Sequence, residues 1–299
     1  MIKKQIIFKT LGASVITGML LSLTACEKDP YMPDAEPTYL EIGSGDATFG
    51  GDNDGQPVLN SIKIMTYNIH ALNPPSKPGE TDINATAKVI KDSGADIVFL
   101  QEVDKNTGRY NFSDDQAKKL GELTEMNYAF FSATSVGRGF YGVAMLSKYP
   151  IKSVKKFLLT REENTEQRVL GVGYIDLPGV DSVLAAVTHL QHNSETNRLQ
   201  QIKDVINTLS NYNDKIIIGG DFNEKESATD FFSLFDKAFK RTCSGPGCPP
   251  TFSTQLPGSV IDYLAFRPSN AFTVKSHEVI YETYASDHFP VIAELNFNR

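Results

Sequence analysis

Five short polar motifs, each closing an apolar run, recur along this chain of 299 residues and constrain its fold more than any other feature. They are TYN ending at Asn68, QE ending at Glu102, TH ending at His189, GGDFN at 219–223 and SDH at 286–288, and a sixth, IDY at 261–263, lies between the last two. Apolar runs bounded by turn residues are typical of buried strands. If the strand ends converge, their Asn, Glu, Asp and His side chains form a site that suits a hard metal ion and a phosphate.

The apolar pattern predicts a single domain, 61–299, that opens with alternating strands and helices. The first two strands, 62–68 and 95–102, are separated by a helix from about residue 82, so we expect them to pair in parallel. Further apolar runs predict strands at 141–148, 168–176, 182–190, 215–223, 260–266, 275–281 and 289–297. This mixed order favours an α+β arrangement, in which helices lie outside paired sheets.

Apolar residues at helical spacing predict further helices at about 113–126, 195–210 and 227–235. In the first of these we expect Ser113 to be the N-cap and Leu123 to face inward. Pro178-Gly179 marks a turn between two of the strands, and those strands are expected to form a hairpin.

The first 60 residues lack the pattern of a packed domain. Three lysines precede an apolar stretch from Leu11 to Leu23, which is shorter than a membrane span and typical of a signal peptide. The residues before Cys26 resemble a bacterial lipobox, which implies removal of residues 1–25 and lipid attachment to Cys26; the alternative is an ordinary signal peptide with a chance cysteine. Residues 26–60 are rich in Gly, Asp, Pro and Asn and predict a flexible tether. We therefore expect an exported protein anchored at the cell envelope, on the periplasmic or surface face of the outer membrane.

Export changes the charge that a substrate meets. Residues 1–25 hold three of the 29 basic residues and none of the 36 acidic ones, so the remainder carries a net charge of −10. Bulk charge does not hold such a chain on nucleic acid, although a local basic patch is an alternative. Cys243 and Cys248 bracket a turn-forming segment, and an oxidising compartment favours a disulfide between them over free thiols or a zinc site.

The GGDFN motif places two polar side chains on one side of a strand. Because side chains alternate, Asp221 and Asn223 face one way and Phe222 faces the other. Gly219 and Gly220 allow a backbone or a ligand to approach closely. The alternative is an Asx turn that caps the next helix.

Other polar residues at strand ends have both a structural and a functional interpretation. Glu102 follows an apolar strand and must be solvated, paired or bound to a metal. Asn68 is either a turn residue or a site residue. His189 is either a site residue or a polar residue at a strand end whose hydrogen bonds are satisfied. His192 has no second ligand at helical spacing, so we expect it on the surface.

Asp262 lies inside an apolar strand, and a buried carboxylate needs a partner. His288 is the natural candidate, because an Asp–His pair fixes the imidazole tautomer and raises its basicity; an arginine or a backbone amide is the alternative. Asp287 and His288 are adjacent and cannot both face the core, so one of them is expected to face a cleft; the alternative is a surface loop in which Asp287 caps a helix or a strand.

Taken together and in this order, the motifs resemble those of the endonuclease/exonuclease/phosphatase superfamily, from Ile62 to about Phe297. GDFN and SDH, with IDY between them, are the most specific. RGFYGVAMLSKYPI resembles the segment that precedes the hairpin in this family, which makes Tyr141 a candidate site residue, and Arg168 resembles the strand arginine that faces the phosphate. The resemblance implies a DNase I-like fold: a four-layer α/β/β/α sandwich of two packed mixed β-sheets flanked by helices.

The resemblance also implies residue roles. The ligands that it implies for a Mg²⁺ or Mn²⁺ ion are Glu102, Asn68 and Asp287. The residues that it implies around the substrate phosphate are Arg168, His189, Asn223 and Tyr141. For the base that activates water it leaves two candidates, His288 oriented by Asp262, or Asp221.

The expected function is metal-dependent hydrolysis of a phosphodiester or phosphomonoester by water attack on phosphorus. The substrate could be a nucleic acid, a phospholipid head group or a small phosphate ester. The negative charge argues mildly against a nucleic acid, and the absence of a long apolar hairpin from the sequence argues mildly against a sphingomyelinase. We expect a monomer without a protein partner. The alternative is a non-catalytic envelope lipoprotein on the same fold, but every expected site position is filled.

Overall fold

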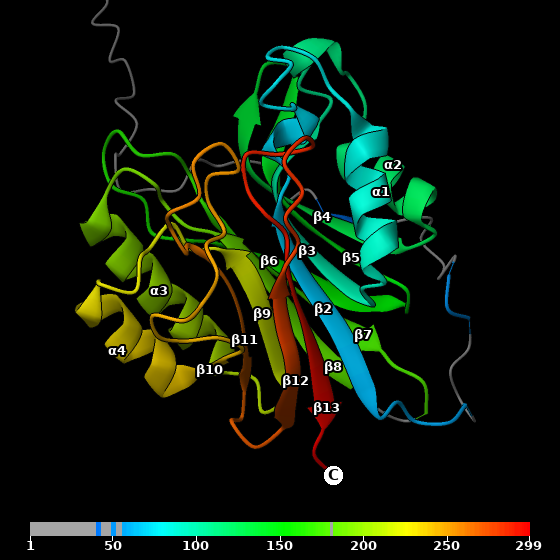
Figure 1. Cartoon of the computed structure of the whole chain (residues 1–299), viewed down its shortest axis with the longest axis vertical. Helices are drawn as coiled ribbons and strands as arrows, with labels where there is room; N and C mark the ends of the chain where they lie inside the picture. The colour runs from blue at the N-terminus through cyan, green and yellow to red at the C-terminus, as the bar shows by residue number, and fades with distance from the viewer. Residues whose placement is uncertain (1–39, 43–48, 52–55, 180–181) are drawn as a thin grey trace, which may run out of the picture.

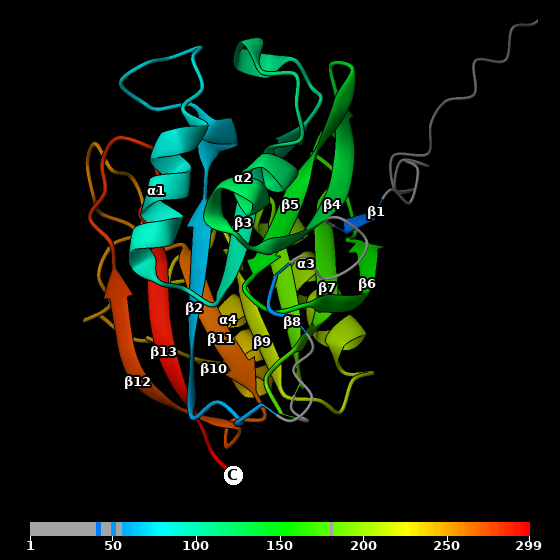
Figure 2. The same ribbon diagram turned by 90° about the vertical axis from the view of Figure 1, so that its right-hand side faces the viewer.

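The structure is a computed structural model of the chain and describes residues 40–42, 49–51, 56–179 and 182–299. In these residues two mixed β-sheets pack face to face, and helices cover both outer faces (Figures 1 and 2). The predicted four-layer α/β/β/α sandwich is therefore confirmed.

The first sheet contains seven of the described strands in the order β1-β4-β5-β3-β2-β13-β12. Their bounds are β1 Leu40–Ile42, β2 Ser61–Asn68, β3 Ile97–Lys105, β4 Asn127–Val136, β5 Gly139–Ser147, β12 Phe272–Val279 and β13 Val291–Phe297. β2 and β3 pair in parallel, as the opening β-α-β order predicts, and the other neighbours are antiparallel.

The second sheet contains six described strands in the order β10-β11-β9-β8-β7-β6. Their bounds are β6 Ile151–Leu158, β7 Val169–Asp176, β8 Ser182–His189, β9 Ile216–Asp221, β10 Lys240–Arg241 and β11 Asp262–Arg267. β7 and β8 form the predicted antiparallel pair. β8 and β9 pair in parallel, and α3 connects them in the sequence.

Two helices cover each sheet. α1 (Ile83–Ser93) and α2 (Gln116–Thr124) lie on the first sheet, and α3 (Glu195–Leu209) and α4 (Thr229–Ala238) lie on the second (Figure 1). The prediction of Ser113 as the N-cap of α2 is wrong, because the helix begins later and the Asp115 carboxylate accepts the Lys118 N–H. Leu123 is 38 % exposed instead of buried, because the shorter helix buries Ala117 and Leu120.

Side-chain alternation divides the apolar residues between one inter-sheet core and two outer cores. In β2, Ile64 faces the other sheet, whereas Met65 packs beneath α1 and α2. In β9, Ile217 faces the first sheet, whereas Ile218 packs beneath α3 and α4. Strands that are buried on both faces have continuous apolar runs, which explains the pattern in the sequence.

Glycines allow the two sheets to approach each other. A Cβ atom at Gly219 would lie 2.3 Å from Cδ2 of Phe99 on the opposite sheet, and a Cβ atom at Gly220 would lie 2.4 Å from the Thr188 carbonyl oxygen. The predicted close approach at this glycine pair is thus confirmed, and it is made by a phenylalanine ring and a neighbouring backbone.

Among the strands that the structure describes, β4, β6 and the two-residue β10 are not predicted by the apolar pattern. β4 follows α2 almost directly, so no cluster of turn residues marks its start. β6 is an edge strand on which Lys152 and Lys155 are exposed. Lysines are typical of edge strands, where they prevent pairing with another chain, but they hide the apolar alternation.

Part of the predicted tether belongs to the fold. β1 pairs antiparallel with β4, and the Phe49 N–H donates to Oδ1 of Asn127 at 3.3 Å. Residues 40–42 therefore form a strand within the segment predicted as a flexible tether, and this strand is too short to show a period. The predicted signal peptide and the lipidation site at Cys26 lie outside the described residues, and the boundaries at residues 25 and 60 remain predictions.

The predicted disulfide between Cys243 and Cys248 is present. It closes a loop that Glu226 holds by accepting the Gly245 N–H at 2.9 Å. Of the helices in the described ranges, none combines the length and the apolar character that crossing a membrane requires.

We predict that Gly219→Ala lowers the free energy of unfolding by about 1–3 kcal/mol, because the added methyl group clashes with the Phe99 ring in a packed core. Chemical denaturation measures the loss. Gly247→Ala is the control, since a Cβ atom there meets nothing within 4 Å. Equal stability of the two variants would contradict the role assigned to Gly219.

Candidate active site

Polar residues replace apolar ones at one end of the inter-sheet core. A buried polar residue that faces the other sheet ends each of the strands β2, β8 and β9 and begins the antiparallel strand β11. These residues are Asn68, His189, Asp221 and Asp262. Within the second sheet, the register places Asp221 opposite Asp262 on one neighbour and opposite His189 on the other. The structure therefore brings together strand ends from both sheets, as the sequence predicts.

Glu102 reaches the same end through a β-bulge. Regular alternation would turn Glu102 with Leu100 toward the helices, but the register of β3 against β5 shifts between Leu100 and Val103. Glu102 itself has a φ of 56°. A bulge re-aims a side chain, and Oε1 of Glu102 consequently accepts a hydrogen bond from Nδ2 of Asn68 at 3.0 Å.

The Asn68 amide contacts both sheets. Its Nδ2 donates to Glu102 and, at 3.1 Å, to Oδ2 of Asp221, and lies 3.4 Å from Nε2 of His288. Its Oδ1 accepts the backbone N–H of His70. An amide has two N–H hydrogens, so the two carboxylates use both of them.

Asp262 holds His288, as the sequence predicts. Nδ1 of His288 lies 3.0 Å from Oδ2 and 3.2 Å from Oδ1 of Asp262, and Nε2 lies 3.7 Å from Oδ2 of Asp221. The Phe252 ring packs against the imidazole with a centroid distance of 4.7 Å. The imidazole is therefore fixed between two carboxylates and covered by an aromatic ring.

The pKa values of His288 and Asp221 both rise in this cluster. Burial lowers the pKa of His288, but the carboxylates of Asp262 and Asp221 outweigh burial and raise the pKa to about 10. Burial and the nearby Asp262 raise the pKa of Asp221 to about 7, against the lowering effect of His288. Without a metal ion, His288 is therefore protonated at neutral pH and Asp221 exchanges its proton near neutrality.

Hydrogen-bond donors line the other flank of the site. Nη1 of Arg168 lies 3.0 Å from Nδ1 of His189, and Nδ2 of Asn223 lies 3.0 Å from Nε2 of His189. Burial and the Arg168 charge hold the pKa of His189 well below its usual value, so this imidazole is neutral. Buried Tyr141 on β5 hydrogen-bonds to Arg168. These four residues are the ones expected around a phosphate.

Arg168 has unused capacity for an anion. It is buried, and its Nη2 lies 3.1 Å from Oε2 of Glu166. Its Nε has no hydrogen-bond partner among the residues that the structure describes. A buried donor without an acceptor is costly, and a bound phosphate oxygen would satisfy it. His192 is exposed, as predicted, although its Nδ1 lies 3.3 Å from Nη2 of Arg168.

Asp287 lies at the rim of the site with a side chain 30 % exposed. Ser286 connects it to β2, because Oγ of Ser286 donates to the Asn68 carbonyl at 2.7 Å. Nδ1 of His70 lies 3.8 Å from Oδ1 of Asp287. None of the sequence motifs includes His70. The position of His70, two residues after the candidate strand end Asn68, is the signal that could have found it.

The donor chemistry of this end suits a hard divalent cation. Ligand atoms of Asp221, Asp262 and His288 lie within 4.8 Å of one another, and Glu102 is joined to Asp221 through Asn68. Burial and the neighbouring Asp262 raise the pKa of Asp221, so a nearby cation would stabilise its ionised form. Carboxylate oxygens are the ligands that Mg²⁺ and Mn²⁺ prefer.

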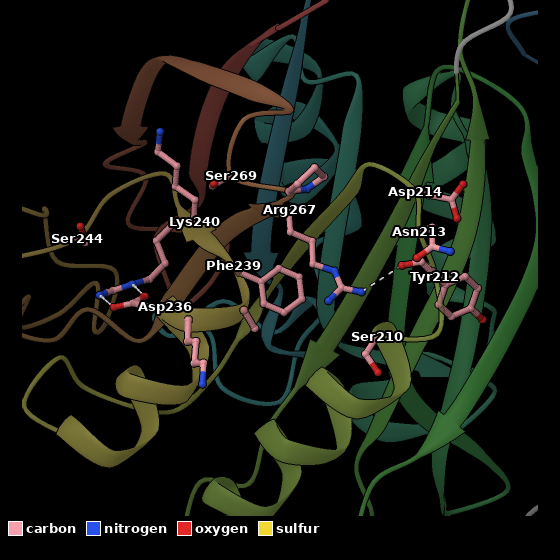
Figure 3. A pocket seen from close by; sticks show the side chains of 14 residues that line it. Ser210, Tyr212, Asn213, Asp214, Asp236, Phe239, Lys240, Ser244, Arg267 and Ser269 are labelled. Carbon is pink, nitrogen blue, oxygen red and sulfur yellow. Dashed lines mark hydrogen bonds and ion pairs between the residues drawn. The ribbon is translucent and has the colours of Figure 1, made fainter.

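A cavity of about 840 Å³ lies at the opposite end of β11 and contains none of the predicted site residues (Figure 3). Its two arginines have structural partners. Arg267 donates to the carbonyl oxygens of Leu209 and Tyr212 at the end of α3, and Arg241 pairs with Asp236 (Figure 3). The converging strand ends are therefore the better candidate for chemistry.

Comparison with known families gives one match that spans most of the chain. The profile of the endonuclease/exonuclease/phosphatase family matches residues 65–288. The matched segment extends from β2 to His288 and contains all the predicted site residues. Among curated proteins, no sequence matches the chain.

Solved structures share the fold at low sequence identity. An endonuclease/exonuclease/phosphatase from Beutenbergia cavernae DSM 12333 is 22 % identical, with a TM-score of 0.68 over 80 % of this chain and 72 % of that chain. A mannosyl-6-phosphatase from Bacteroides thetaiotaomicron VPI-5482 is 18 % identical, with a TM-score of 0.61 over 79 % and 100 %. ANGEL2, a 2',3'-cyclic phosphatase, is 15 % identical, with a TM-score of 0.62 over 83 % and 99 %. These similarities establish the fold.

We predict that Asp262→Asn lowers the pKa of His288 in the metal-free protein, because it removes the carboxylate that most favours the imidazolium form. NMR titration of the five histidines measures the shift. The exposed His192 is the internal control and should keep its pKa. An unchanged His288 pKa in the variant would show that Asp262 does not hold the proton on this ring.

Proposed function

Because the chain belongs to the endonuclease/exonuclease/phosphatase family, whose members hydrolyse phosphate esters, we propose that it is a phosphoesterase that requires Mg²⁺ or Mn²⁺. The observation that carries the proposal is the meeting of strand ends from both sheets, with carboxylates on one flank and hydrogen-bond donors on the other. A phosphate ester needs both, because its anionic oxygens repel a nucleophile unless their charge is neutralised.

The proposed metal ligands are Glu102, Asn68 and Asp287. The bulge that turns Glu102 into the site supports its role, as does its hydrogen bond to Asn68. When bound, the ion would stabilise negative charge on the phosphate and on the leaving oxygen. The Asp221, Asp262 and His288 group is a second set of candidate ligands, but the hydrogen bond between Asp262 and His288 already satisfies two of its members.

The proposed phosphate site consists of Arg168, His189, Asn223 and Tyr141. The buried Nε of Arg168, which has no partner among the described residues, would donate to a phosphoryl oxygen. Nδ1 of the neutral His189 accepts from Arg168 and therefore holds this donor in place before a substrate arrives, while Nε2 lies 3.0 Å from Nδ2 of Asn223. Donors that are fixed in advance stabilise charge in the transition state without a cost of reorganisation.

We assign the base that activates water to Asp221. A general base must first be positioned for the proton that it accepts, and Oδ2 of Asp221 is fixed 3.5 Å from Nε2 of His189 and 3.7 Å from Nε2 of His288. His288 is held as an imidazolium by Asp262 and Asp221, so it is better suited to stabilise negative charge than to accept a proton. Asn68 and the Asn223 N–H orient the Asp221 carboxylate through one oxygen each.

The ester type stays open in this proposal. One structural neighbour is a mannosyl-6-phosphatase and another is a 2',3'-cyclic phosphatase, so the fold serves more than one phosphate ester. Nucleic acid, phospholipid head groups and small phosphate esters remain the substrate classes. The net charge of −10 after residue 25 disfavours a nucleic acid, since the excess of acidic residues repels a polyanion.

We also propose that lipid attached to Cys26 anchors the protein at the outer membrane. The support is the basic and apolar start of the sequence and the small residues before Cys26. Cell fractionation checks this: Cys26→Ser should move the protein out of the membrane fraction, and a variant that stays in that fraction would contradict lipid anchoring.

We predict that EDTA abolishes hydrolysis of bis(p-nitrophenyl) phosphate and p-nitrophenyl phosphate, and that Mg²⁺ or Mn²⁺ restores it. Glu102→Gln should require a higher metal concentration for half-maximal rate, because it removes the main proposed ligand charge. Glu122→Gln on the exposed face of α2 is the charge-matched control. Turnover that resists chelation would exclude the metal-dependent mechanism, and no turnover with any divalent metal would favour a binding protein.

We predict that Asp221→Asn and His288→Ala each lower kcat by about 10²–10⁴-fold, because one removes the base and the other removes a cation that faces the developing charge. Steady-state kinetics measures the loss, and thermal unfolding verifies that each variant is folded. Retention of most of the activity by a folded variant would remove that residue from the mechanism.

A further inference from the structure

Arg109 lies beside the candidate site, and none of the sequence motifs includes it. It begins the short 3-10 helix η2 (Arg109–Asn111) in the connection between β3 and α2. Its guanidinium carbon lies 5.1 Å from the ring centre of Tyr141 and 5.8 Å from that of Tyr110. The side chain is 33 % exposed, so a cation next to the proposed phosphate site also faces solvent.

A buried carboxylate fixes the orientation of Arg109. Nε donates to Oδ2 of Asp104 at 2.8 Å and Nη2 donates to Oδ1 at 2.6 Å, while Oγ of Thr107 also donates to Oδ2 at 2.7 Å. This side-on pairing occupies one edge of the guanidinium. Among the described residues no acceptor is found for Nη1, so the opposite edge still carries unused donors.

The pairing is built on the same strands as the site. Asp104 is the register partner of Tyr141, and its side chain is only 2 % exposed. A buried carboxylate needs a cationic partner, and Arg109 meets that need with Nε and Nη2. Stability therefore accounts for one edge of the guanidinium, whereas Nη1, which this pairing does not use, is available for recognition.

Tyr141 separates the two guanidinium groups. Arg168 hydrogen-bonds to its hydroxyl, and Arg109 lies over its ring. We propose that Arg109 binds a second anionic group of the substrate, a carboxylate or a phosphate, about one aromatic ring away from the scissile phosphate. This inference rests on the proposed function, because it assumes that a phosphate ester occupies the Arg168 side. Asp104 is a positioning residue that aims Arg109.

The test measures binding of phosphonates, which are not hydrolysed, by calorimetry in the presence of Mn²⁺. The probes are 3- and 4-carboxyphenylphosphonate, and the carbamoyl analogues are neutral controls of equal size. We expect wild type to bind at least one acid about tenfold or more tightly than its amide, since a charge-assisted hydrogen bond is lost with the amide. Arg109→Ala should abolish this preference, and Arg109→Lys should retain part of it.

Lys203→Ala, which removes an exposed cation on α3, should keep the preference and controls for net charge. The inference is overturned if wild type has no preference for either acid, or if Arg109→Ala keeps the preference. Equal weakening of acid and amide by Arg109→Ala would also overturn it, because Arg109 would then only support Tyr141. If wild type hydrolyses phosphate esters but binds acid and amide equally, this inference alone is refuted. If wild type prefers the acid but hydrolyses no ester, the proposed function is refuted.

Discussion

The Asn68 amide is the interaction on which the candidate site depends. It donates to Glu102 on its own sheet and to Asp221 on the opposite sheet, so it sets the separation of two carboxylates that no single strand could place. The carboxylates repel each other and would move apart without a shared donor. The site is therefore a property of how the two sheets pack, and the packing in turn requires glycine at 219, where the Phe99 ring crosses from one sheet toward the other.

Much of this arrangement could be predicted from the sequence because strand alternation is strict. Asp221 faces the inter-sheet space because Ile217 does, and Asp262 follows the same rule on its neighbour, so the two meet. The Asp262–His288 pair could be predicted because a buried carboxylate inside an apolar strand requires a partner. The position of Glu102 could not be derived in this way. Alternation alone sends Glu102 under the helices, and only the bulge returns it.

The parts that sequence reasoning missed lack a repeating pattern. β1 is three residues long, and its pairing with β4 depends on a partner far away in the chain. His70 and Arg109 lie in short 3-10 helices after β2 and β3, where neither the strand period nor the α-helix period applies, and contacts with the Asp287 and Asp104 carboxylates help to place them. Such contacts are set by the backbone path of the loop, which has no local signal beyond the presence of turn residues.

Local charge separation reconciles the acidic chain with an anionic substrate. Glu102, Asp221 and Asp262 occupy one flank of the site, and Arg168 and Arg109 occupy the other, with Tyr141 between the two arginines. A phosphate held between the flanks meets cations at contact distance, whereas salt screens exposed charges that lie farther away than the Debye length, about 8 Å at physiological ionic strength. Net charge therefore selects against long polyanions that would cover the acidic surface, while it leaves a compact anion able to bind. The unused edge of Arg109 extends this selection, because it favours a compact substrate with a second anionic group over one with a neutral group.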